Sequence, residues 1–280
     1  MISWKPWVGQ PKGLAQLNRA TSLANGLVFL SVPYQRYDLI SKKFFTLVSA
    51  PTLNPDAGGI GFKTNGSSNY GYVIIPSVAL TSYTIFAVVQ GTSPGTSSWI
   101  VALGSTSNST PIGTLASGNS TPTKVRLWMR DDNNNQPVTA DSVKTVFDGM
   151  PHIVHMVLRL DASATWRYDC YIDGLFDSSN GIGSGSLVTT IDTVCIGALL
   201  RQGASQNFYN GLTYFAGVAA REWSAREIAE HAQNPYQLIV APRQRAVSPA
   251  AAAAAARLKA IGSSGGFGGG VGTVAVGSAA

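Results

Sequence analysis

Glutamate is scarce in this chain of 280 residues. The three glutamates, Glu222, Glu227 and Glu230, lie in one short stretch, and none precedes them. Charged residues make up only 12% of the chain, whereas Gly, Ser, Thr and Asn are abundant. This composition is typical of an all-β body with uncharged polar loops. It also removes the usual general acid of sugar hydrolysis from most of the chain, so we expect no catalytic residues and a protein that is not an enzyme.

The scarcity of cysteine and the lack of long apolar segments exclude further classes of protein. Cys170 and Cys195 are the two cysteines, too few for a disulfide framework, and each lies in an apolar run that favours a buried free thiol. The first residues contain no apolar segment of the kind found in a signal peptide. No run of 18 apolar residues exists, so the sequence predicts no transmembrane helix and no membrane partner. We expect the chain to be made in a bacterial cytoplasm.

The net charge of +6 belongs to the two ends of the chain. Residues 1–20 and 241–280 contain basic residues and no acid, so the part between them is almost neutral. Basic ends suggest contact with an acidic partner or nucleic acid, or are simply solvated. Because no basic helix with interleaved aromatics is present, nucleic acid is the less favoured partner.

Short β-branched and aromatic runs, separated by Gly, Ser, Thr and Asn, indicate strands through most of the chain. Their spacing leaves no room for crossover helices, so the predicted fold class is all-β: a jelly-roll sandwich of two antiparallel sheets. The expected strands are near 26–31, 44–48, 59–64, 70–75, 83–90, 99–103, 112–116, 124–130, 143–147, 152–160, 167–172, 187–189, 192–197 and 211–219.

Local signals predict one hairpin and one helix within this body. Asp173-Gly174 favours a tight β-turn, because both residues tolerate positive φ. Ser224 and Glu227 form a capping-box pattern that begins a short helix near 224–233, and Asn234-Pro235 ends it.

The two ends differ from the body. Residues 1–24 are predicted to form an arm with a helical turn near 14–17. Residues 241–280 are predicted to form a second arm, with an alanine-rich helix that begins at Ser248-Pro249 and a glycine-rich tail after Gly262. The body is then 25–240. The residues expected to dock on a partner are Trp4, Trp7, Arg243, Arg245, Arg257 and Lys259.

A succession of motifs resembles the concanavalin A-like lectin/glucanase domains, also called laminin-G-like, over residues 25–235. The motifs, in order, are YGYVII (70–75), YTIFAVV (83–89), GMPHIVHMV (149–157), YDCYIDG (168–174), IG (196–197), FYNGLTYFAGVA (208–219) and WSAREI (223–228). Flanking motifs, QPKG (10–13), ANGLVF (24–29) and NPYQLI (234–239), are similar to those of tailed-bacteriophage proteins that carry this domain. The Glu-x-Asp-x-Glu strand of the sugar-cleaving members is absent, so the resemblance implies no hydrolase activity.

Several residues are candidates for ligand binding. Asp131, Asp132 and Asn133 are able to supply oxygen ligands to Ca²⁺, but a solvated hairpin loop after Arg130 is the favoured interpretation. Asp169 and Asp173 alternate with Tyr171 and would project beside a glycan. The Asp-Gly turn explains Asp173 without any ligand.

Aromatic and histidine residues are weaker candidates. Trp128 and Trp166 would offer stacking platforms to sugar rings, unless they lie in the core, as tryptophan in a sandwich more often does. His152 and His155 lie on opposite faces of a strand, which argues against a shared metal, and we predict no metal site. We expect His231 to be a cation at a helix end or solvated.

Two functions follow as hypotheses. The main one is a non-enzymatic bacteriophage virion protein in capsid, tail or fibre, anchored by its arms to other virion proteins and forming a homo-oligomer. The alternative is a lectin-like module that binds a glycan of the host surface.

Overall fold

The structure of the protein is a computed structural model, which describes residues 15–32, 35–56, 59–92, 94–110, 112–133, 141–160, 165–184 and 188–240. The predicted docking residues Trp4, Trp7, Arg243, Arg245, Arg257 and Lys259 lie outside the described residues, as does the alanine-rich segment. No helix in the covered ranges is long and apolar enough to cross a membrane.

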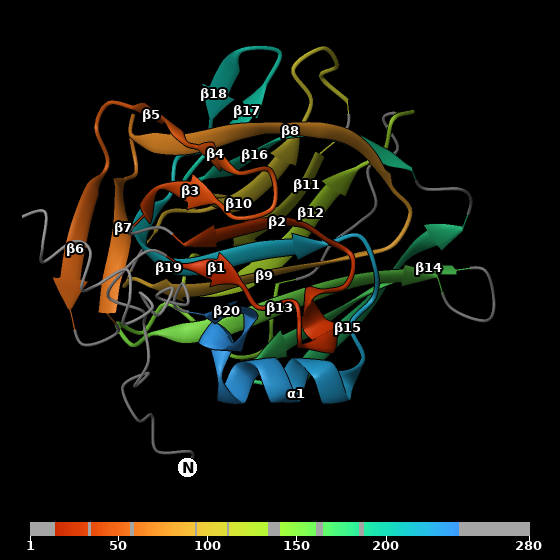
Figure 1. Ribbon diagram of the computed structural model, residues 1–280. Helices are drawn as coiled ribbons and strands as arrows, with labels where there is room; N and C mark the ends of the chain where they lie inside the picture. Colours follow the sequence, from red (N-terminus) through yellow and green to blue (C-terminus); the bar gives the residue numbers. More distant parts are fainter. Residues whose placement is uncertain are drawn as a thin grey trace, which may run out of the picture. The chain divides into compact units, whose positions relative to one another are not determined.

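Two antiparallel sheets form the body (Figure 1). The six-stranded sheet has the order β12 (Val125–Arg130), β11 (Ile112–Ser117), β10 (Trp99–Gly104), β16 (Thr189–Ile196), β8 (Tyr70–Leu80), β5 (Thr46–Val48). The ten-stranded sheet has the order β15 (Leu175–Ser184), β14 (Thr165–Ile172), β13 (His152–Leu160), β9 (Tyr83–Gln90), β19 (Asn210–Ala219), β2 (Leu27–Val32), β3 (Tyr37–Asp38), β4 (Lys43–Phe44). In the same sheet β7 (Gly59–Asn65) pairs with β19, and β6 (Thr52–Asp56) pairs with β7.

The main core lies between the two sheets. In β9, Tyr83, Ile85, Ala87 and Val89 share one face, as their alternation predicts, and all four belong to this core. The same core takes Leu127 from the six-stranded sheet. The prediction of an all-β sandwich is therefore confirmed.

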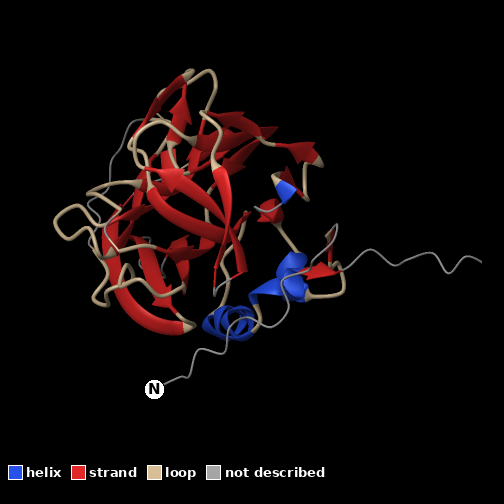
Figure 2. Ribbon diagram, turned by 90° about the vertical axis from the view of Figure 1, so that its left-hand side faces the viewer, coloured by secondary structure: helices blue, strands red, loops and turns tan. Residues whose placement is uncertain are grey.

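The outer face of the ten-stranded sheet is also covered. A second core there joins its side chains to helix α1 (Ala225–Gln233) and to the 3₁₀ turns η1 (Ser22–Ala24) and η3 (Pro235–Leu238). The short strands β1 (Gln16–Leu17) and β20 (Ile239–Val240) pair beside them. These helical turns are short pieces in a molecule dominated by strands (Figure 2).

The outer face of the six-stranded sheet has a smaller cover. The hairpin of β17 (Leu199–Arg201) and β18 (Ala204–Gln206) places Leu199 and Leu200 in a third cluster with Trp99. Each sheet is thus buried on its inner face and partly covered on its outer face.

Helix α1 begins at the predicted capping box. The Glu227 backbone N–H donates to Ser224 Oγ (3.3 Å), and the Ser224 N–H donates to the Glu227 carboxylate (2.9 Å). The helix ends at Gln233, and Asn234 follows as its C-cap. Both predicted ends are confirmed.

Two local predictions are wrong. Residues 143–147 form no strand, because the backbone N–H groups of Val143 and Lys144 donate to the Asp177 carboxylate (2.7 and 2.8 Å) instead of to a neighbouring strand. Gln16–Leu17 is a strand rather than part of a helical turn, because it pairs with residues from the far end of the body. In both places, contacts with residues far along the chain determine the local structure, and no local sequence pattern indicates these contacts.

Both cysteines are free and buried, as predicted. Cys170 lies in the main core and Cys195 in the cluster outside the six-stranded sheet. Burial raises the pKa of each thiol well above its usual value, so both stay protonated.

The β14–β15 hairpin turns at Asp173-Gly174, with φ of 58° and 81°. Ile172 pairs with Leu175 across the turn, so this is the tight turn that the sequence predicts. A Cβ on Gly174 would lie 2.8 Å from the Ala232 side chain of α1. Glycine is therefore needed both for its backbone conformation and for the approach of the helix.

We predict that Gly174→Ala destabilises the protein by more than Gly203→Ala. Gly203 has a similar φ of 76° in the β17–β18 turn, but a Cβ there would meet nothing within 4 Å. Its substitution costs only the left-handed conformation, about 1–2 kcal/mol. Denaturant unfolding of the two variants measures the difference, and equal losses would show that the contact with α1 contributes nothing.

Two histidines are buried against each other beneath α1. His155 and His231 are both 0% exposed, and His155 Nε2 and His231 Nδ1 are 2.8 Å apart. Burial lowers the pKa of His231 to about 3 and that of His155 well below its usual value. The expectation that His231 is a cation or solvated is wrong, because the aromatic rings of Phe86 and Trp223 enclose it.

The free energy of unfolding should therefore fall on acidification, and should begin to fall at a higher pH than that at which carboxylates take up protons. In the unfolded chain these histidines take up protons below about pH 6.5, whereas the folded chain excludes them. Their contribution is present above that pH and is lost as pH falls, by up to about 2 kcal/mol for each histidine at pH 5.0. Urea unfolding between pH 7.5 and 5.0 measures this loss.

His152 provides an internal control. Partial burial lowers its pKa, but its contacts with Asp173 (2.9 Å) and Asp148 (3.2 Å) outweigh this and raise the pKa overall. NMR of the native protein should show His152 titrating while His155 and His231 do not. Titration of the buried pair near pH 6.5 in the folded protein would contradict the prediction.

Candidate functional site

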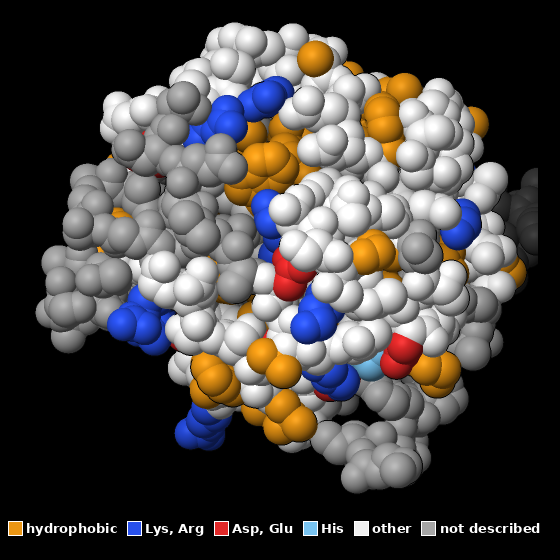
Figure 3. Space-filling model, turned by 180° about the vertical axis from the view of Figure 1, so that it is seen from behind, with side chains coloured by type: hydrophobic (Ala, Val, Ile, Leu, Met, Phe, Trp, Pro, Cys, Tyr) orange, Lys and Arg blue, Asp and Glu red, His pale blue; other side chains and the backbone are white. Residues whose placement is uncertain are grey.

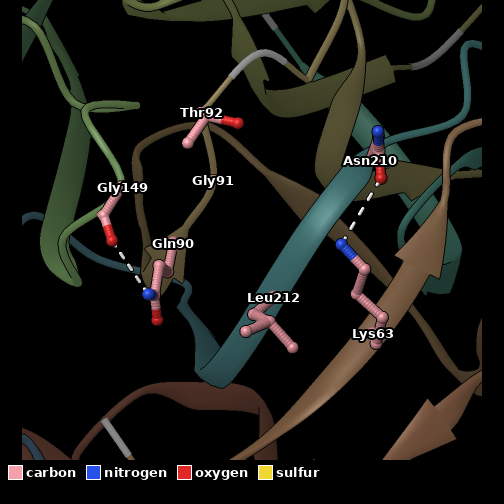
Figure 4. A pocket seen from close by; sticks show the side chains of 7 residues that line it. All are labelled: Lys63, Gln90, Gly91, Thr92, Gly149, Asn210 and Leu212. Atoms are coloured by element: carbon pink, nitrogen blue, oxygen red, sulfur yellow. Dashed lines mark hydrogen bonds between the residues drawn. The ribbon is translucent and has the colours of Figure 1, made fainter. Parts of the chain in front are cut away.

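An open pocket of about 210 Å³ lies where β7, β19 and β9 run side by side (Figure 4). The register places Leu212 of β19 opposite both Lys63 of β7 and Gln90 of β9. These three side chains project from the outer face of the ten-stranded sheet. We call this pocket the amide pocket; its lining residues are Lys63, Gln90, Gly91, Thr92, Gly149, Asn210 and Leu212.

Hydrogen bonds fix the orientation of the Gln90 side chain. Its Nε2 donates to the carbonyl of Gly149 (2.9 Å), and its Oε1 accepts from the Tyr214 hydroxyl. The Gln90 backbone carbonyl accepts from Tyr209 (3.1 Å). Gln90 is thus held by hydrogen bonds to three residues and supports one wall of the pocket.

The side chains of the opposite wall form fewer hydrogen bonds with the rest of the protein. Lys63 Nζ lies 3.5 Å from Asn210 Oδ1, a long hydrogen bond that uses one of the three ammonium donors (Figure 4). The side chains of Asn210 and Thr92 are exposed. Among the described lining residues, Lys63 is the one that carries a charge, so they offer donors and acceptors with a single positive charge.

A second open pocket, of about 360 Å³, lies on the same outer face over β13 and β14. Arg159 Nε donates to Asp169 Oδ2 (2.7 Å) at its floor. The segment that leads from β19 into α1 forms the other wall. We call it the carboxylate pocket; its lining residues are Val157, Arg159, Asp169, Tyr171, Glu222, Trp223, Ser224, Ala225 and Glu227.

The alternation of Asp169 and Tyr171 along one strand does place both in a pocket, as the sequence suggests. Asp173 instead occupies the hairpin turn. The sequence did not indicate Glu222 as a residue of this pocket, because Glu222 belongs to a segment far along the chain and no local pattern links it to β14. Seen from behind, most of the described surface is uncharged, and basic side chains are more numerous on this face than acidic ones (Figure 3).

The predicted calcium ligands have structural roles. Asp132 accepts from the Thr190 backbone N–H (2.7 Å) and hydroxyl (2.6 Å). Asp131 is fully buried and accepts from the Asn133 N–H (3.0 Å). Within the covered ranges, no group of three or more His, Cys, Asp or Glu residues is arranged to hold a metal ion.

Trp128 and Trp166 lie in different clusters. Trp166 is 4% exposed in the core between the sheets, so its ring is turned away from ligands. Trp128 is half-buried outside the six-stranded sheet, edge-on to Trp99 (5.1 Å) and beneath Arg126 (5.3 Å). The two tryptophans therefore do not form one platform, and neither lines either pocket.

The fold and the two pockets define an antiparallel β-sandwich with open polar sites on one outer face. Among solved structures it is similar to the binding domain of botulinum neurotoxin serotype G, with 11% identity, coverage of 74% of this chain and 50% of that one, and a TM-score of 0.56. The binding domain of botulinum neurotoxin serotype D/C gives 11% identity, coverage of 76% and 53%, and a TM-score of 0.56.

A third similar structure is Domain 4 of AbnA, a GH43 extracellular arabinanase from Geobacillus stearothermophilus, solved in complex with arabinotriose. Identity is 12%, coverage is 74% of this chain and 98% of that one, and the TM-score is 0.51. At these identities the similarity shows the fold alone. This chain spans about half the length of the neurotoxin domains. No family model and no curated protein matches the chain.

Asp132→Ala should lower the free energy of unfolding by about 1–3 kcal/mol, because two hydrogen-bonded groups of Thr190 lose their acceptor. Asn133→Ala, an exposed position in the same loop, should change it by no more than about 0.5 kcal/mol. Thermal and denaturant unfolding measure both. Equal losses would mean that the loop, rather than the Asp132 carboxylate, determines stability.

Proposed function

We propose that this chain is a non-catalytic glycan-binding module and that the amide pocket is its sugar site. The observation that carries the proposal is the arrangement of that pocket: an oriented amide, a second exposed amide, an ammonium and a hydroxyl line one open depression. Sugar hydroxyls both donate and accept hydrogen bonds. A pocket with both kinds of group, placed on rigid strands, matches that chemistry.

The similarity to Domain 4 of AbnA supports this proposal, because that domain was solved with arabinotriose and shares the sandwich fold. The composition adds to it. A surface with few charges and many amides and hydroxyls suits an uncharged, hydrogen-bonding partner.

The described lining of the amide pocket supports a binding role rather than a catalytic one. Glycoside hydrolysis uses a pair of carboxylic acids beside the scissile bond, and none of the lining residues of the amide pocket is an acid. The pocket is therefore suited to holding a sugar rather than cleaving it.

The bacteriophage virion role, with anchoring by residues 1–24 and 241–280, remains a hypothesis based on sequence resemblance. The host surface glycan of the alternative hypothesis is the partner that the amide pocket best supports. A glycan-binding module in a virion would reconcile the two.

The test is a titration of the purified chain with a panel of oligosaccharides that includes arabinotriose, followed by calorimetry or NMR. Lys63→Ala should weaken the binding of a glycan found in this way by roughly 10-fold or more, because a charge-assisted hydrogen bond contributes about 1.5–3 kcal/mol. Asn210→Ala should weaken it roughly 3- to 10-fold, as expected for a neutral hydrogen bond.

Lys43→Ala is the matched control. Lys43 is also a strand lysine with a single Nζ hydrogen bond, to the carbonyl of Ile74 (2.8 Å), but it lies on β4, away from the pocket. Its substitution should leave affinity unchanged. Silence of the whole panel, or equal losses from Lys63→Ala and Lys43→Ala, would refute the amide pocket as the sugar site.

A further inference from the structure

The carboxylate pocket is not used by the proposed sugar site, and its charges are unbalanced. Asp169 is only 6% exposed, yet Arg159 engages just one of its oxygens, Oδ2 (2.7 Å). The other oxygen, Oδ1, is buried and has no hydrogen-bond partner in the described part of the chain. A buried carboxylate oxygen normally has a donor, so Asp169 is left short of one.

Glu222 faces the same pocket from the opposite wall. Partial burial raises its pKa, the nearby charge of Asp169 raises it further, and Arg159 acts in the opposite direction. Partial burial is the largest of these effects, and the attraction of Arg159 is not enough to offset it, so Glu222 holds its negative charge less easily than a free glutamate.

The remaining charges on this wall are already paired. Glu227 accepts from Arg221 Nη2 (2.7 Å) and from the Ser224 N–H (2.9 Å). Partial burial opposes, but these contacts outweigh it and lower the pKa of Glu227. Among the described residues, Arg159 is paired with Asp169 and Arg221 with Glu227, and Glu222 forms no ion pair.

One side of the pocket is aromatic. The half-buried ring of Tyr171 lies there, packed edge-on against Phe176 (5.5 Å), with Trp223 in the opposite wall. An aromatic face beside carboxylates favours a cation attached to a small carbon skeleton, because the ring attracts positive charge.

We propose that the carboxylate pocket binds a primary ammonium group between Asp169 and Glu222, and that the ligand which carries it is an amino sugar. An ammonium offers three N–H donors and one positive charge. The donors would reach the buried, unpartnered oxygen of Asp169 when that carboxylate rotates toward the pocket, and the charge would pair with Glu222. A divalent metal fits less well, because no group of three suitable ligands exists in the described ranges. That the ammonium is carried on a sugar rests on the proposed glycan-binding function; the ammonium site itself does not.

The probes are glucosamine, N-acetylglucosamine and glucose, titrated into the full chain at pH 6.5 and followed by NMR. Glucosamine should perturb the signals of Tyr171 and Glu222 and bind at least 10-fold more tightly than N-acetylglucosamine, whose nitrogen is uncharged. Added salt should weaken binding, because the attraction is between charges. Equal binding of the three sugars, or no binding of glucosamine, would overturn the proposal.

Glu222→Gln tests the site without disturbing the core, because Glu222 is exposed. It should weaken glucosamine binding roughly 3- to 10-fold. Asp169→Asn should weaken it more, and if that variant does not fold, Glu222→Gln still decides. Glu230→Gln, an exposed glutamate on α1 outside the pocket, is the matched control and should have no effect. Equal effects of Glu222→Gln and Glu230→Gln would overturn the site.

The outcome is separable from that of the proposed function. Lys63→Ala should leave the glucosamine-induced changes in the signals of Tyr171 and Glu222 intact, because Lys63 lines only the amide pocket. Loss of these changes in Lys63→Ala would place the ligand in the amide pocket and refute this inference while supporting the other. If the chain binds glucosamine but no other glycan, the ammonium site is supported and the amide pocket is refuted as a sugar site. Displacement of glucosamine by millimolar Ca²⁺ but not by methylamine would identify a metal site and overturn the inference.

Discussion

Burial of both faces of β9, inside the ten-stranded sheet, is the constraint on which this structure depends. All residues of β9 from Tyr83 to Val89 are buried, and only Gln90 at its end is partly exposed. Because side chains alternate across a strand, such a strand requires cover on both sides. The six-stranded sheet supplies one cover, and α1 with the segments around it supplies the other. The amide pocket opens at Gln90, where the outer cover ends.

That outer cover is closed by segments from the two ends of the body. β1 pairs with β20, and the backbone N–H of Asn18 donates to Leu238 (2.8 Å). A bulge in β19 between Thr213 and Phe215 places Tyr214 and Phe215 together against this outer core. Tyr214 then reaches Gln90. The geometry of the amide pocket is thus a consequence of how the outer face is packed.

Much of the fold could be predicted because local sequence patterns indicate most of its strands. Alternation fixes the inward face of β9, and the capping box and Asn234 fix both ends of α1. What local pattern cannot give is pairing over long range. β15 escaped prediction because its middle, Asp177 to Gly181, is polar and carries no β-branched residue; it is a strand because it extends the edge of the sheet beside β14.

The sites were less predictable than the fold. Asp169 and Tyr171 share a face that alternation reveals, but Glu222 joins them only after the chain has crossed β19 and turned toward α1. The residues of the amide pocket come from four separate segments, none with a motif of its own. Trp166 was predicted as a candidate stacking platform because of its residue type, but it is buried in the core.

The two sheltered thiols have a practical consequence. Since Cys170 and Cys195 are buried and protonated, the native protein presents no nucleophilic sulfur from its own sequence to an alkylating dye. A single cysteine engineered at an exposed position such as Asn133 would be the sole point of covalent attachment. The molecule is therefore ready for site-specific fluorophore or spin-probe labelling with its natural cysteines left in place.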